Sequence, residues 1–82
     1  MTRKEFLHEL QVALQGEIDQ AAVNENIKYY DNYIMEESRK GKSEEEVTAQ
    51  LGNPRLIAKT LIEKKKKMGH PNGQYYSGDY SG

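Results

Sequence analysis

The sequence predicts an all-α fold, a small bundle of three or four helices with a disordered C-terminal tail. Three observations support this prediction. Apolar residues recur at spacings of three and four rather than two, as on one face of a helix. Each periodic segment begins at a serine, threonine, aspartate or asparagine, and glycines follow the ends of three of them, which are the usual signals of helix boundaries. The connections are short, as in helix bundles, and 82 residues allow one domain.

The first helix is expected over residues 2–15. Thr2 and Glu5 have the spacing of a capping box, in which each side chain accepts a hydrogen bond from the other residue's backbone N–H. Gly16 ends the helix. The apolar stripe of this segment consists of Phe6, Leu7, Leu10, Ala13 and Leu14.

The second helix is expected over residues 20–39, with Asp19 as its N-cap. Lys40 and Gly41 close it, since a cation is favourable near the last carbonyls and glycine readily takes a left-handed conformation. Its apolar stripe consists of Val23, Ile27, Tyr30 and Ile34.

Two further helices are expected over residues 43–51 and 54–68. The first buries Val47 and Leu51, and the second extends the core with three residues. The complete predicted core is Phe6, Leu10, Leu14, Val23, Ile27, Tyr30, Ile34, Val47, Leu51, Ile57, Ala58 and Leu61.

A tight corner joins these two helices. Ser43 and Glu46 have capping-box spacing at the start of the first. Gly52 is expected to end that helix in a left-handed conformation. Asn53 then caps the next helix, and Pro54 takes its first position, where no N–H is needed. Such a corner occurs both in DNA readers and in small domains that only pack.

Residues 69–82 differ from the rest of the chain. They are rich in glycine, contain one proline and three tyrosines, and lack aliphatic residues, a composition that does not offset the entropy of ordering. We therefore expect a helical domain at 1–68 and a flexible linker or tail at 69–82.

Composition excludes several classes of protein. There is no cysteine, and therefore no disulfide or thiolate chemistry. No segment has the ~20 apolar residues of a membrane span, and the N-terminus lacks the apolar run of a signal peptide.

The charge is unevenly distributed along the chain: residues 1–53 carry six Lys/Arg and eleven Asp/Glu, whereas residues 54–68 carry six Lys/Arg and one Glu. A local contact with something anionic fits this pattern better than a wholly basic nucleic-acid module.

A helix-turn-helix DNA-binding domain is the alternative interpretation of the corner, with residues 54–68 in the major groove. Asn53 stands where such turns usually have an apolar residue, Thr48 stands where they have a small one, and the glutamates at 44–46 would lie near the phosphates. The residues expected to face outward at the start of the second helix are Pro54, Arg55, Leu56, Lys59 and Thr60. We do not expect nucleic acid to be the partner.

The lysine run Lys64, Lys65, Lys66 and Lys67 has two interpretations. Cations in the last turn of a helix interact well with its negative pole. A run of four also suits an anionic membrane surface, at about 1 kcal/mol per lysine, or a juxtamembrane position on the cytoplasmic side.

Tyr29 and Tyr33 share one edge of the second helix at four-residue spacing. Their rings either cap the core with hydroxyls in water, or form an aromatic contact patch for a protein partner or a second copy in a homodimer.

No catalytic, cofactor or metal site is expected. His8 has only carboxylates nearby, whereas a metal needs a second ligand of fixed geometry one turn away. The glutamates at 36–37 and 44–46 could be paired carboxylates, but acid–base catalysis needs a sheltered site with shifted pKa values. We expect a protein that is not an enzyme.

The chain resembles the HAAS family of small bacterial helical domains. The matching features lie within residues 4–62 and are the KEFL motif followed by Leu10, the pair Tyr29-Tyr30, GKSEEEV at 41–47, and LGNP at 51–54 followed by Ile57-Ala58. The chain departs from the family at GEIDQ, 16–20, where members commonly have a proline.

The resemblance implies a compact all-α cytoplasmic domain at the N-terminus of a bacterial membrane protein, at the inner face of the cell membrane. Such domains are often encoded beside PadR-like transcription regulators, and a signalling or sensing role is proposed for them. The resemblance transfers no enzymatic residues.

Overall fold

A computed structural model describes the backbone of residues 1–68 and the side chains of residues 1–65. Within this part the chain is all-α and has no strand, which confirms the predicted fold class. The predicted tail, 69–82, lies outside the described residues. The helices are α1 (Arg3–Leu14), α2 (Gln20–Arg39), α3 (Glu44–Leu51) and α4 (Pro54–Met68).

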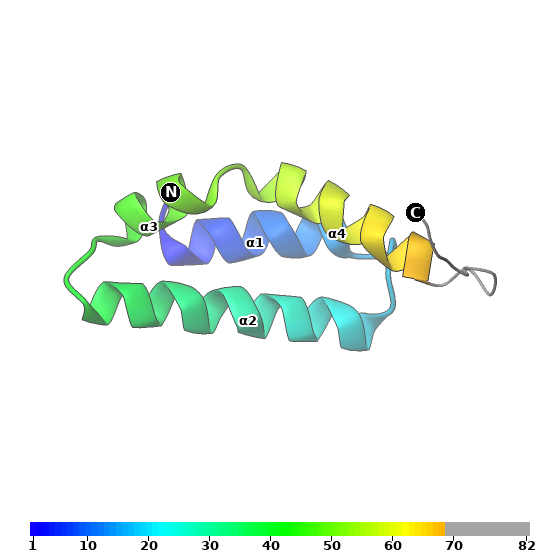
Figure 1. Ribbon diagram of the computed structural model, residues 1–82, viewed down its shortest axis with the longest axis horizontal. Coiled ribbons are helices and arrows are strands. Elements are labelled where there is room, and N and C mark those ends of the chain that lie inside the picture. The colour runs from blue at the N-terminus through cyan, green and yellow to red at the C-terminus, as the bar shows by residue number, and fades with distance from the viewer. Residues whose placement is uncertain (69–82) are drawn as a thin grey trace, which may run out of the picture.

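The helix α1 lies in the middle of the bundle (Figure 1) and contacts each of the other three helices. α2 runs antiparallel along one side of it, while α3 and α4 follow one another along the other side. The fold is elongated and thin, with extents of 44 × 26 × 17 Å. α4 runs in the same direction as α1, so its C-terminal end lies beside the α1–α2 loop and α3 lies at the opposite end.

The helix ends follow from local capping. Thr2 and Glu5 form the predicted capping box, with N···O distances of 2.9 and 3.1 Å. The Asp19 carboxylate accepts from the backbone N–H of Ala22 at 2.7 Å. Because Thr2 and Ser43 are caps rather than helical residues, α1 and α3 begin one residue later than predicted.

The core is smaller than predicted. Its seven fully buried hydrophobic residues all belong to the predicted set and are Phe6, Leu10, Leu14, Val23, Ile34, Val47 and Ala58. The other five predicted core residues pack against this cluster but remain partly exposed, and are Ile27, Tyr30, Leu51, Ile57 and Leu61. α4 packs mainly on α1 rather than on α2, so residues between α2 and α4 lie at the rim.

Two buried residues were not predicted to be in the core. Thr48 is 3% exposed because it lies under the N-terminus, where its hydroxyl donates to the Met1 carbonyl at 2.7 Å. Pro54 is fully buried. Its burial contradicts the outward position that the DNA-binding interpretation gave it.

The corner between α3 and α4 depends on an unusual backbone conformation. Gly52 has φ 96° and ψ −165°, so φ is positive as expected, but ψ is extended rather than left-handed helical. This region is essentially restricted to glycine. Asn53 then caps α4, because its side-chain oxygen accepts from the backbone N–H of Arg55 at 2.8 Å.

Substitution of Gly52 tests this conformation. We expect Gly52→Ala and Gly52→Asn to lower the free energy of unfolding by about 1–3 kcal/mol each. A Cβ at this position would meet nothing within 4 Å, so the cost is that of the backbone alone. Asparagine tolerates the left-handed helical region, but Gly52 lies outside that region. We therefore expect asparagine to destabilise the protein as much as alanine does. Chemical denaturation measures both variants, and a Gly52→Asn variant as stable as the parent would contradict the observed ψ.

Candidate functional site

The basic end of α4 projects beyond the helix on which it packs. The Arg55 Nε lies 2.9 Å from the Glu9 Oε1, which aligns the two helices. Beyond this contact, α1 continues for five more residues, to Leu14, and α4 continues for thirteen more residues, to Met68. At a rise of 1.5 Å per residue, the remaining eight residues place the end of α4 about 12 Å past the end of α1.

The described lysines of this end are exposed to solvent. Lys64 and Lys65 are exposed, while the side chains of Lys66 and Lys67 lie outside the described part. Figure 1 shows the last turn of α4 extending past the α1–α2 loop. Across residues 1–68, none of the helices combines the length and the apolar composition needed to cross a bilayer.

A glutamate cluster and several cations lie together at the opposite end of the molecule. Glu44, Glu45 and Glu46 form the first turn of α3, where negative charge is favourable. Ser43 caps this helix by accepting from the N–H of Glu46 at 3.1 Å. The reciprocal bond of a capping box is missing from the hydrogen bonds of the described residues, so that half of the prediction is wrong. Instead, Glu44 accepts from the N–H of Arg3 at 2.8 Å and holds the N-terminus against α3.

An aromatic row runs from the core to the surface of α2. The rings of Phe6 and Tyr30 are 6.0 Å apart, and Tyr29 meets Tyr30 edge-on at 5.0 Å. Desolvation raises the pKa of the Tyr30 phenol, and the neighbouring Tyr29 adds to this effect. Tyr29 is 61% exposed and Tyr33 38% exposed. These two tyrosines therefore present aromatic surface to solvent, and the ring of Tyr29 is supported by Tyr30.

A charged cluster closes the loop between α2 and α3. Both carboxylate oxygens of Glu37 accept hydrogen bonds from lysine ammonium groups at 3.0 Å, one from Lys42 and one from Lys40. These bonds, led by that from Lys42, hold the pKa of the Glu37 carboxyl below its usual range, and Glu37 in turn raises the pKa of Lys42. Such a carboxylate stays charged and poorly suited to donate a proton, so the arrangement points to a structural role.

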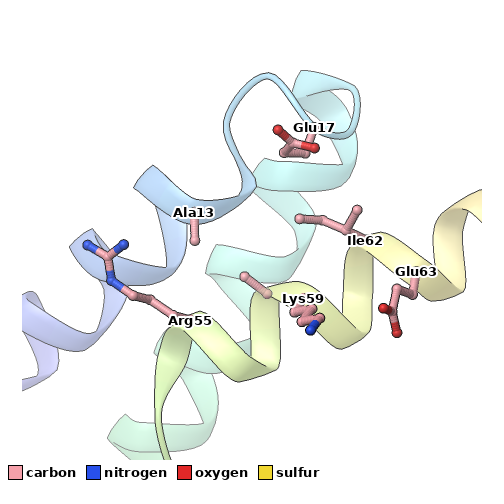
Figure 2. Close-up of a pocket in the computed structure, with 7 residues that line it drawn as sticks. Ala13, Glu17, Arg55, Lys59, Ile62 and Glu63 are labelled. Atoms are coloured by element: carbon pink, nitrogen blue, oxygen red, sulfur yellow. The ribbon is translucent and has the colours of Figure 1, made fainter.

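Two adjoining grooves follow the seam on which α4 rests. The first, of about 300 Å³, has a floor of Ala13, Ala58 and Ile62. Figure 2 shows that the charged groups around it, which include Glu17 and Glu63, point in different directions rather than toward one point. The second, of about 420 Å³, lies beside Met1 and Gly52. The described residues contain no group of three or more His, Asp or Glu that could hold a metal, and His8 is exposed.

The geometry of α4 argues against DNA reading. Pro54 is buried, and Arg55, a residue type suited to pair with guanine, contacts Glu9 instead. The glutamates of α3 would also face the phosphates. Sequence reasoning missed the Glu37 cluster, although its partners lie only three and five residues away; the charge pattern at the end of α2 could have indicated it.

The Glu37 cluster predicts a pH dependence of stability. The folded-state pKa of Glu37 lies below its usual value of 4.5, so its stabilising effect is present above pH 4.5 and is lost as the pH falls through the folded-state value. We expect Glu37→Gln to lower the unfolding midpoint at pH 7, with a difference from the parent that shrinks toward pH 3.

Glu36→Gln is the matched control. Glu36 is 61% exposed and has one i,i+3 partner, whereas Glu37 is 14% exposed and has two partners. Thermal unfolding followed by circular dichroism at several pH values compares the three proteins. Equal effects of the two substitutions at pH 7 would contradict a special role of Glu37.

Comparison with known proteins places the chain in a family but gives no close relative. A search of curated proteins and a search of solved structures both return no match. The family model HAAS matches residues 5–60, which include α1, α2, α3 and the first half of α4. This match covers more than half of the chain and agrees with the resemblance noted in the sequence. The chain belongs to the HAAS family.

Proposed function

We propose that this chain is a non-enzymatic interaction or signalling module of a bacterial membrane-associated protein, acting at the cytoplasmic face of the membrane. The observation that carries the proposal is the separation of two unlike surfaces on one small scaffold. One is the tyrosine patch, Tyr29 and Tyr33, on α2. The other is the lysine end, Lys64 to Lys67, on α4.

The tyrosine patch suits a protein partner. Tyrosine supplies a large rigid contact area with a polar tip and is enriched in interfaces. Tyr29 rests on Tyr30, which rests on Phe6, so its ring loses little further freedom on binding. A second copy of the chain is one candidate partner. Neither contact needs a cofactor or a reaction.

The lysine end suits an anionic membrane surface. Lysines near such a surface contribute about 1 kcal/mol each, and the projecting turn of α4 keeps them clear of the acidic body. This placement also agrees with the position that HAAS domains are thought to occupy beside transmembrane segments.

Site-specific photo-crosslinking tests the tyrosine patch. A benzophenone amino acid at position 29 or 33 should give a discrete adduct in the source bacterium, or an adduct of twice the chain mass if the partner is a second copy. Asn24 is the matched control, because it is exposed on the same helix but lies about 140° from Tyr29 around the axis. Adducts of equal yield at all three positions, or none, would contradict the patch.

Flotation with vesicles tests the lysine end. The quadruple variant Lys64→Gln, Lys65→Gln, Lys66→Gln and Lys67→Gln should lose binding to phosphatidylserine vesicles, with each substitution weakening binding about fivefold. Lys28→Gln is the control, since Lys28 is exposed on the body of the domain. Neutral vesicles should not bind either protein. Retained binding of the quadruple variant would place the membrane contact elsewhere.

A further inference from the structure

The four lysines occupy successive positions of one helix. α4 continues to Met68, so Lys64, Lys65, Lys66 and Lys67 lie about 100° apart around its axis. Together these positions encircle the helix and share no face. A helix lying flat on a planar surface would bring only about two of the four into contact. All four approach one plane together only when the helix meets that plane steeply.

The packing of α4 permits such an approach. Its last turns extend about 12 Å past the end of α1, and Figure 1 shows no other helix reaching as far in that direction. Glu17, in the α1–α2 loop, lines one groove with Ile62 and Glu63 of α4, so it lies at the level where the lysine run begins. The later lysines of the run therefore lie farther out than this carboxylate, and an anionic surface meets them first.

The opposite end of the molecule offers no comparable contact for an anionic surface. The carboxylates of Glu44, Glu45 and Glu46 lie on α3, at the far end of a body 44 Å long. The Debye length at physiological ionic strength is about 8 Å, so these carboxylates do not cancel the field of the lysines. At the α3 end Arg39, Lys40 and Lys42 are paired with Glu36 or Glu37, so an anionic surface attracts the lysine tip more strongly than the α3 end.

We infer that the domain binds an anionic bilayer end-on, through the projecting C-terminal turns of α4, with the α3 end directed away from the lipid. This inference rests on the membrane contact of the proposed function and adds its geometry. α2 then stands steeply on the membrane, with Tyr29 and Tyr33 midway along its height and open to a partner arriving from the side.

Energy transfer from a protein label to a lipid acceptor tests the orientation. The chain has no cysteine, so one introduced thiol gives one labelled site. Glu63→Cys labels the lysine end and Glu45→Cys labels the α3 end, both at exposed positions. On phosphatidylserine vesicles containing an acceptor lipid, transfer from position 63 should be several-fold more efficient than from position 45. Circular dichroism checks that both labelled proteins are folded.

The outcomes separate this inference from the proposed function. If neither label shows transfer and the protein does not float with the vesicles, the membrane contact itself is wrong. If the protein binds but the two positions show equal transfer, the domain lies flat and the end-on orientation is wrong. Higher transfer at position 63, lost in the quadruple lysine-to-glutamine variant and at high salt, supports the inference.

Discussion

Burial of the apolar stripe of α1 is the constraint on which the rest of the structure depends. Phe6, Leu10 and Leu14 are fully buried, and they supply three of the seven buried hydrophobic residues although α1 is only 12 residues long. α2, α3 and α4 all use α1 as their common surface. A domain of this size buries only about 60% of its unfolded surface, so little other apolar burial is available. Loss of this stripe would remove the support of every other helix at once.

The sequence was sufficient for the features that depend on neighbours along the chain. The helix boundaries, the Thr2–Glu5 box and the caps at Asp19 and Asn53 follow from residues at most three positions apart. The apolar periodicity also identified all of the fully buried hydrophobic residues, because burial of one helical face is imposed by any bundle.

The features that sequence reasoning missed depend on which helix faces which. Nothing in the local pattern indicates that Thr48 lies under Met1, or that Glu44 accepts from Arg3 forty-one residues away. Glu46 illustrates the limit of a motif: its spacing from Ser43 suits a capping box, yet only half of that box is formed. The lysine end also combines a local feature with a tertiary one: its charge was evident from the sequence, but its projection past the end of α1 was not.

The corner at Gly52 links the fold to the proposed function. α3 ends and α4 begins within two residues, and this abrupt change is achieved by a backbone conformation that other residues take only with strain. Burial of Pro54 then fixes the first turn of α4 against the body. Since α4 is one continuous helix from that anchored turn to the lysines, the corner sets the direction in which the basic tip projects. In the proposed function, a partner at the tyrosine patch on α2 and a membrane at the tip would therefore be held in a defined relation by contacts through α1.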